Sequence, residues 1–340
     1  RMKIGLLADV HANQHALDAV VQHSGDIGVD SFWFLGDAVG YGPHPLQALE
    51  FLVEHVVPDP DGDWVLGNHE IILKKMDELS NHEEMTATML EEQVELQGYM
   101  NTTKLEEQVG LKAKLAMEIN LHVLRGSQAW PNFQHALSLE HVRPRSHLID
   151  EVDYCIVHSG QVRPHLYRYV YPWEREIKLT EEFCRLEEMA ECNGRVSIQC
   201  CGHTHVPVLV QAETVKGEQD YDFQVEQVCP DKTYPLDHTL GLINPGSVGQ
   251  PRDNDNRAAY AVLDTEPVPH TVTFHRVEYE WTKTFQELHQ AWAEVQWPDE
   301  YQISHKMYRR LIQSHLRDAD FTAAAPPEWR EHFENGGLQG

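Results

Sequence analysis

The chain has 340 residues, 41% of them hydrophobic and 9% aromatic, which is enough for a full core in one large domain or two smaller ones. Its formal net charge of −27 would repel a polyanion, so we exclude a nucleic-acid polymer as the expected partner. The longest apolar runs are far too short to span a bilayer, and the N-terminal residues enter a strand pattern without a basic leader, so we expect no membrane association, no secretory signal and a cytoplasmic location.

Strand and helix patterns alternate over the first third of the chain. Short apolar runs at residues 3–8, 31–36 and 63–67 predict buried strands. The segments 13–25 and 44–56 between them have helical spacing. Strands that alternate with helices predict βαβ units and a parallel sheet.

Residues 72–142 have a different composition, rich in Glu, Leu, Lys and Met, and predict two or three helices. Three interpretations remain open for this segment. It packs as a helical layer on the core, it caps a site and limits access to it, or it forms the contact of a homo-oligomer.

The α/β pattern then resumes, and the chain ends in helices. In order, the sequence predicts a strand at 152–160, a helix at 179–192, a strand at 195–205, strands and turns over 206–264, a strand at 270–280, and helices at 285–295 and 305–318. The tail from residue 321 is expected to be poorly packed. Cys155, Cys200 and Cys201 lie in apolar runs and are expected to be buried, reduced thiols, and no C-x-x-C pair indicates a structural zinc site.

Polar side chains follow five of the short apolar runs. The ligands of an open parallel sheet bind beyond the carboxyl ends of its strands, so we expect these side chains to converge on one edge. Each group alone has a plain explanation as a turn or a hydrogen-bonded core histidine, but five groups at strand ends do not. They are Asp9 and His11, Asp37, Asn68 and His69, His158, and His203 and His205.

The types of these side chains indicate metal binding. Carboxylate, amide and imidazole ligands without cysteine suit Mn, Fe, Zn, Co or Ni rather than thiophilic metals. Two aspartates, one asparagine and four or five of the histidines give at least seven ligands, which is more than one tetrahedral zinc ion needs. They fit two divalent ions that share one carboxylate.

The ordered motifs "DVH", "GDAVGYGP", "GNHE", "VHSG" and "GHTH" resemble those of the calcineurin-like metallophosphoesterases. The later segment "INPGSVGQPRDNDNRAAYAVLD" resembles the small bacterial phosphodiesterase-like branch. The resemblance covers residues 2–71 and 150–280. It implies an α/β fold, a four-layer αββα sandwich over residues 1–320, with 72–142 as a helical insertion or cap and 321–340 as a C-terminal tail.

The chain departs from the family pattern at three positions that spare every ligand. Ala8 and Ala12 stand where the family often has Ser and Gly, and Ser159 separates His158 from Gly160. These changes are expected to alter hydrogen bonds around the ligands and so to tune the choice of metal.

The resemblance also implies residue roles. His69 would face the substrate and protonate the leaving group. Glu70 either orients the imidazole of His69 or is an acid favoured by the helix dipole. One metal, with manganese favoured, would be held by Asp9, His11 and His205, and the other by Asn68, His158 and His203, with Asp37 bridging the two.

Three further residues are expected to contact the substrate. Arg252 would reach a phosphate group, unless it forms an ion pair with Asp253 or a neighbour. Asn13 and Tyr41 follow ligand motifs closely and would line the site.

The resemblance implies a phosphoesterase that hydrolyses small phosphodiesters by attack of a metal-bridging hydroxide. The alternatives are a phosphomonoesterase or phosphoprotein phosphatase of the same fold, or a non-catalytic protein-binding scaffold. The complete ligand set and the presence of His69 favour an enzyme over a scaffold.

Overall fold

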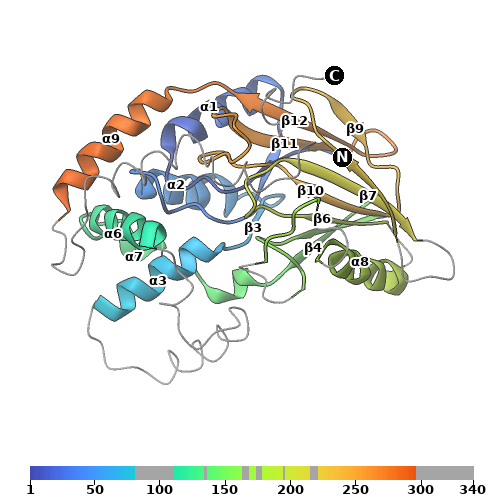
Figure 1. Cartoon of the computed structure of the whole chain (residues 1–340), viewed down its shortest axis with the longest axis horizontal. Helices are drawn as coiled ribbons and strands as arrows, with labels where there is room; N and C mark the ends of the chain where they lie inside the picture. Colours follow the sequence, from blue (N-terminus) through green and yellow to red (C-terminus); the bar gives the residue numbers. More distant parts are fainter. Residues whose placement is uncertain are drawn as a thin grey trace.

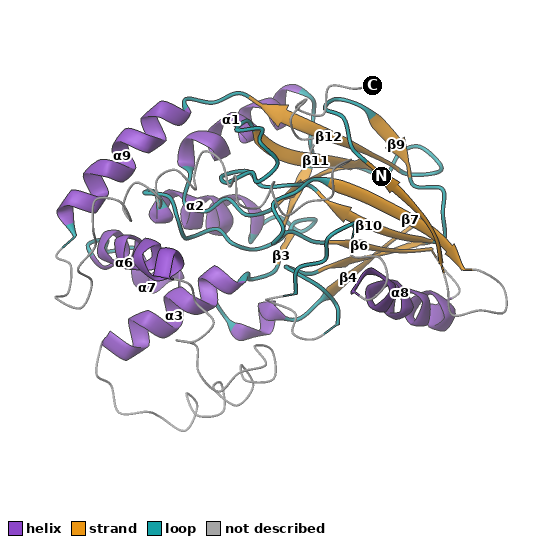
Figure 2. Cartoon of the chain, viewed as in Figure 1, coloured by secondary structure: helices purple, strands orange, loops and turns teal. Residues whose placement is uncertain are grey.

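The computed structural model describes residues 1–80, 111–133, 136–162, 168–173, 178–193, 196–214 and 221–295. Within these residues, two six-stranded sheets lie face to face, and helices cover their outer faces (Figures 1 and 2). The predicted helix at 305–318, the domain boundary at residue 320 and the tail 321–340 lie outside the described residues.

The first sheet has the strand order β3-β2-β1-β11-β12-β9. Its parallel half is the predicted βαβ region, and its antiparallel half comes from the later part of the chain. The strands are β1 (Lys3–Leu7), β2 (Ser31–Phe34), β3 (Asp63–Trp64), β9 (Thr233–Pro235), β11 (Ala258–Asp264) and β12 (Thr271–Val277). Its crossover helices are α1 (Gln14–Asp26) and α2 (Pro45–Phe51), which continues as the π-helical turn η1 (Leu52–Val56).

The second sheet has the strand order β4-β5-β6-β10-β7-β8. Its central strands β5, β6 and β10 are parallel, and antiparallel strands flank them. The strands are β4 (Arg145–Ile149), β5 (Val152–Ile156), β6 (Val196–Cys200), β7 (Val208–Thr214), β8 (Tyr221–Glu226) and β10 (Leu240–Asn244), with helix α8 (Thr180–Asn193) on the outer face. Cys155, Cys200 and Cys201 are buried and free, as the sequence predicts.

Side chains at successive positions of each strand face opposite sides of the sheet, and this alternation explains the layered packing. Leu7 and Phe34 point to the helices of the first sheet, whereas Leu6 and Trp33 point to the second sheet and pack with its Tyr154. Side chains at successive strand positions face opposite sides, so a strand buried on both faces is apolar throughout. A third cluster fills the space between the second sheet and α8, which completes four layers.

Further helices extend the layer outside the first sheet. They are α3 (Asn68–Ser80), α6 (Leu111–Arg125), α7 (Trp130–Phe133), the 3₁₀ turn η2 (Leu139–Val142) and α9 (Trp281–Glu294). Met117 and Leu121 of α6 pack in the same core as Leu49 of α2, so the described part of the 72–142 segment is a packed layer. The cap and homo-oligomer interpretations of 72–142 stay predictions, and residues 81–110 of this segment lie outside the described residues.

Candidate metal centre

The predicted ligands lie where the carboxyl ends of β1, β2, β3, β5 and β6 meet. These strands belong to both sheets, so the prediction that the ligands converge on one edge of a single sheet is wrong. Buried parallel strands have the same apolar pattern whichever sheet contains them, which is why periodicity did not separate the two. The backbone amide of His203, after β6, donates at 3.0 Å to Asp9 Oδ2, after β1, and so joins the two sheets.

Two groups of ligand atoms form around a shared carboxylate. In the first group, His205 Nε2 lies 3.1 Å from His11 Nε2 and 3.4 Å from Asp9 Oδ1. In the second, His158 Nε2 lies 3.2 Å from both Asn68 Oδ1 and His203 Nδ1.

Asp37 lies between these groups. Its Oδ2 is 3.8 Å from His11 Nε2 and 3.4 Å from His158 Nε2. Its Oδ1 accepts a hydrogen bond of 2.9 Å from the backbone amide of His69. This partition of the seven side chains is the one that the resemblance implies.

The hydrogen bonds of the first group show that its residues fit a cation. His11 Nδ1 lies 3.0 Å from the carbonyl oxygen of Val39, and His205 Nδ1 lies 2.6 Å from that of Gln250. Carbonyl oxygens only accept, so each Nδ1 carries the hydrogen and each Nε2 keeps a lone pair. These two lone pairs face each other beside the carboxylate of Asp9, which is repulsive unless a proton or a metal ion lies between them.

The second group has the same property. His158 Nδ1 lies 2.8 Å from the carbonyl oxygen of Leu35, so its Nε2 faces the Asn68 and Asp37 oxygens, which accept but do not donate. Burial lowers the pKa of His158, but the Asp37 carboxylate outweighs it and raises the pKa to about 9. A proton on His158 thus occupies the place that a cation would take.

Burial and mutual repulsion set the protonation of the other ligands. Burial, with the neighbouring charge of Asp37, raises the pKa of Asp9 to about 8. Burial lowers the pKa of His11 and His205 well below its usual value, so both imidazoles are neutral and able to bind a metal. Burial alone would raise the pKa of Asp37, but the nearby histidines, His158 first, hold it well below its usual range.

The backbone at the ligands is strained. Left-handed φ angles occur at Asp9 (54°), His11 (48°), Asp37 (58°), His203 (65°) and His205 (60°). The left-handed region costs an L-residue about 1–2 kcal/mol. Residues with strained backbone angles cluster at functional sites, where the surrounding structure holds side chains in orientations that a relaxed backbone would not give.

Glu70 does not orient His69. Its Oε2 accepts from the backbone amides of Asp37 at 2.9 Å and Gly67 at 2.8 Å, and its Oε1 accepts from that of Val39 at 3.0 Å. Glu70 lies in the first turn of α3, in agreement with the helix-dipole interpretation. The carboxylate also ties α3 to the loop after β2 and so positions Asp37.

Gly67 allows this close approach. A Cβ at Gly67 would lie 2.0 Å from Asp37 Oδ1 and 2.6 Å from its backbone nitrogen. Only a glycine leaves room for the carboxylate in its observed position.

Aromatic rings border the ligands. The Tyr41 ring lies 4.8 Å from the ring of His11 and 4.7 Å from that of His69. On the other side, the Tyr169 ring lies 4.1 Å from that of His203. The sequence reasoning missed Tyr169, although Tyr169, Tyr171 and Trp173 alternate along "YVYPW" with the period of an extended segment.

Arg252 and Asn13, both predicted to contact the substrate, lie in different surroundings, and only Arg252 is close to the ligands. Asp253 pairs with Arg276, not with Arg252. The Arg252 charge lowers the pKa of His205, and it also acts on His11 and Asp9, so its guanidinium is close to the ligands.

Asn13 does not line the site. Its Oδ1 accepts from Ala16 N at 3.2 Å and Thr284 Oγ1 at 3.0 Å, and its Nδ2 donates to Gly249 O at 3.0 Å and Tyr279 Oη at 3.2 Å. These bonds use the full capacity of the amide, so Asn13 caps α1 and holds α9 instead of binding a substrate.

The model of the calcineurin-like phosphoesterase superfamily domain matches residues 2–267. The chain belongs to this superfamily. One similar protein, the uncharacterized protein MJ0912 of Methanocaldococcus jannaschii, is 22% identical over 84% of this chain and 91% of its own length.

Solved structures agree with this assignment. A metallophosphoesterase from Sphaerobacter thermophilus matches with a TM-score of 0.56 and 25% identity, over 92% of this chain and 99% of its own. The hypothetical protein PH1004 from Pyrococcus horikoshii OT3 matches with a TM-score of 0.54 and 14% identity, over 88% of this chain and 96% of its own, and shows the shared fold. The chain is therefore a metal-binding phosphoesterase by family.

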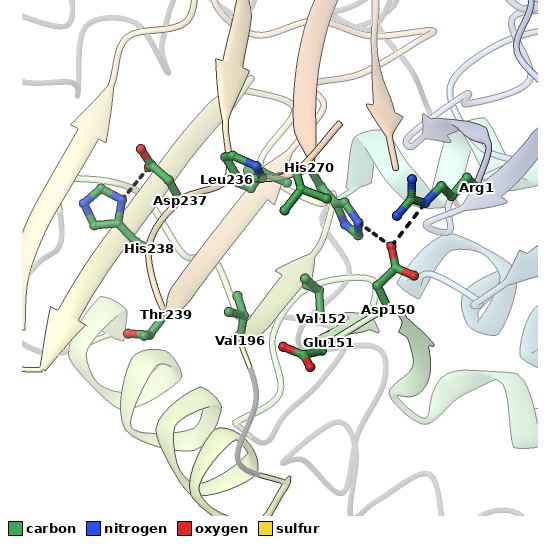
Figure 3. Close-up of a pocket in the computed structure, with 12 residues that line it drawn as sticks. Arg1, Asp150, Glu151, Val152, Val196, Leu236, Asp237, His238, Thr239 and His270 are labelled. Carbon is green, nitrogen blue, oxygen red and sulfur yellow. Dashed lines mark hydrogen bonds and ion pairs between the residues drawn. The ribbon is translucent and has the colours of Figure 1, made fainter. Parts of the chain in front are cut away.

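A separate depression of about 590 Å³ lies at the opposite ends of the strands of this phosphoesterase (Figure 3). Val152 and Val196, at the starts of β5 and β6, line it, and Asp150 contacts His270 at 3.4 Å and Arg1 at 3.8 Å. It shares no residue with the ligand cluster.

None of the helices in the described part of the chain is long and apolar enough to cross a membrane.

Proposed function

We propose that the chain is a dinuclear metal-dependent phosphodiesterase that acts on small substrates. One observation carries this proposal: six buried side chains form two adjacent groups of three, and the carboxylate of Asp37 lies between the groups. Asp9, His11 and His205 would hold one ion, and Asn68, His158 and His203 the other.

Two divalent ions, when bound, would supply positive charge for phosphate oxygens and lower the pKa of a nearby water molecule. Manganese is the ion that we favour, since the set mixes oxygen and nitrogen ligands without thiolate. Buried, free thiols support a cytoplasmic location for the enzyme.

His69 acts as a hydrogen-bond donor in this proposal. Burial lowers its pKa to about 4, so at pH 7 the imidazole is neutral, and the general-acid role expected from the resemblance loses its proton source. Its Nδ1 is buried against Gly40 and has no hydrogen-bond partner among the described residues. An unpartnered ring nitrogen is better left as a lone pair, which places the hydrogen on Nε2, free to donate to a phosphate oxygen.

Charge favours a diester over a monoester. The chain has a net charge of −27, and Arg252 is the cation whose charge reaches the ligand cluster in the described residues. A diester carries one negative charge near pH 7, whereas a monoester carries nearly two, so repulsion penalises the monoester more.

The rim favours a substrate with a planar group. The rings of Tyr169 and Tyr171 stack at 5.6 Å and 19°, and those of Tyr171 and Trp173 at 4.9 Å and 4°, so a row of aromatic side chains leads away from His203. Tyr41 lies on the other side of the cluster. Aromatic side chains bind planar rings through stacking and edge-to-face contacts of modest energy, and these contacts do not require one particular ring.

Hydrolysis of bis(p-nitrophenyl) phosphate and of p-nitrophenyl phosphate, with and without Mn²⁺, tests the proposal. The diester rate should depend on metal, exceed the monoester rate and fall at least 100-fold in Asp37→Ala. Asp61→Ala, an exposed aspartate in the same half of the chain, is the matched control. A faster monoester rate would replace the diester with a phosphomonoester or phosphoprotein substrate, and a chain that neither binds metal nor hydrolyses either ester would be a scaffold.

A further inference from the structure

Two histidines and a glutamate form a second cluster of metal-binding side chains outside the candidate centre. His15 lies on α1, His44 caps the start of α2, and Glu287 lies on α9. Their ligand atoms lie within 4.8 Å of one another. His15 Nε2 is 2.5 Å and His44 Nε2 is 2.9 Å from the same oxygen, Oε2 of Glu287.

We propose that His15, His44 and Glu287 bind a third metal ion, Zn²⁺ by the chemistry of its ligands, which fastens α9 to the loops that carry the candidate centre. Two imidazoles and one carboxylate are a known three-residue ligand set for zinc, with the fourth position left to water or another side chain. This inference goes beyond the proposed function, because it concerns residues outside the reacting site.

The geometry needs little adjustment to hold an ion. Ligand atoms about 2.0–2.2 Å from a tetrahedral zinc ion are roughly 3.3–3.6 Å apart, so the two contacts to Glu287 must open by about 1 Å at most. The Glu287 side chain is 36% exposed and has room for this movement, whereas the histidines are 16% and 13% exposed and stay fixed. Their rings meet edge to face, 5.1 Å apart, with both Nε2 atoms toward Glu287.

Charges of both signs surround the cluster, and Lys283, one helical turn before Glu287, acts on the pKa of that carboxyl. Asp18 follows His15 by one helical turn, and its carboxylate is close enough to act on the pKa of His44. Burial lowers the pKa of His44, so its imidazole is neutral at pH 7. A metal on Nε2 would replace the hydrogen that faces Glu287 and move it to the buried Nδ1. The partial exposure of all three ligands gives an ion a path from solvent.

The position of the cluster gives the ion a structural role. Leu288 of α9 packs on Ile119 of α6, and α9 also lies against α1 (Figure 1). The backbone amide of His44 donates at 2.9 Å to Ala12, one residue after the proposed ligand His11. The ion would therefore join α9 to the loop after β1, which holds Asp9 and His11, and to the loop after β2, which holds Asp37.

Counting zinc ions by native mass spectrometry, after loading with Zn²⁺ and buffer exchange, tests the inference. Wild type should retain one ion more than Glu287→Gln and His44→Gln. Glu294→Gln is the matched control, because Glu294 lies on the same helix and accepts a hydrogen bond of 3.1 Å from Gln290, and it should retain the wild-type number. The comparison is a difference between variants, so it holds whatever number of ions the candidate centre takes.

The Glu287→Gln variant also reports on folding. Its amide oxygen still accepts from both imidazoles, so α9 should stay docked, and the metal-free melting temperatures of variant and wild type should agree. Zinc should then raise the melting temperature of wild type and of Glu294→Gln by several degrees more than that of Glu287→Gln. Equal zinc counts and equal shifts in all variants would show that the cluster is a hydrogen-bonded clamp without an ion, and would overturn the inference.

Discussion

Replacing Glu70 by Gln should damage the candidate centre without touching a proposed ligand. The carboxylate accepts three buried backbone N–H bonds, from Asp37, Val39 and Gly67. A glutamine keeps one acceptor oxygen. In its better orientation it still accepts from Asp37 and Gly67, but its NH₂ group then faces the amide of Val39.

The expected losses of stability and of metal affinity in Glu70→Gln can be estimated. A buried donor without an acceptor costs about 1–3 kcal/mol, so the free energy of unfolding should fall by that amount. The loop that carries Asp37 should also shift, and residues that orient metal ligands typically cost 10–100-fold in metal affinity when they are replaced. Urea unfolding of the metal-free protein and titration with Mn²⁺ measure the two effects, with the exposed Glu54→Gln as the control.

The sign of the stability change separates two accounts of Glu70. Burial, with the charge of Asp37, raises the pKa of Glu70 to about 7, so the two carboxylates repel each other. If Glu70 acted through its charge alone, Glu70→Gln would relieve this repulsion and stabilise the metal-free protein. A stabilised variant, or one that binds Mn²⁺ as tightly as Glu54→Gln, would refute the hydrogen-bonding role.

Three more predictions follow from the centre. Gly67→Ala should lower Mn²⁺ affinity at least tenfold in a folded protein, because its Cβ would lie 2.0 Å from Asp37 Oδ1, and unchanged affinity by calorimetry would contradict this. The pKa of Asp9 is about 8 and that of His158 is about 9, and metal binding displaces both protons, so Mn²⁺ affinity should rise with pH up to about pH 9 and then level off. Proton release should be visible in buffers of different ionisation enthalpy, and a flat profile would be inconsistent. Tyr169→Ala should raise KM for aryl diesters about 5–10-fold but leave KM for methyl diesters unchanged. Tyr169→Phe keeps the ring against His203 and should behave as wild type. An equal effect of Tyr169→Ala on both substrates would indicate a structural role.

The structure brings together the side chains that the sequence singled out as ligands, and their role as ligands stays a prediction. Each motif follows a buried strand, and a polar group such as Asn68–His69 after an apolar run has no packing reason to be there. The first βαβ units, the helix at 179–192 and the buried thiols were predicted from the same local patterns and are confirmed.

Features that depend on long-range contacts could not be predicted this way. Whether a strand such as β5 belongs to the first or the second sheet depends on pairing partners far along the chain, and its apolar pattern is the same in both cases. Asn13 follows the ligand His11 closely and looked like a substrate contact, but Thr284 and Tyr279, some 270 residues later, take up its amide. The three amides bound by Glu70 are backbone groups, which leave no trace in the residue pattern.

The central claim is that Asp37 bridges two ions, and anomalous diffraction from crystals soaked in Mn²⁺ tests it most directly. The account predicts two peaks about 3.5–4 Å apart. One should lie among Asp9, His11 and His205 and the other among Asn68, His158 and His203, with Asp37 in contact with both. A single peak at this position, or two peaks without Asp37 between them, would contradict the dinuclear assignment.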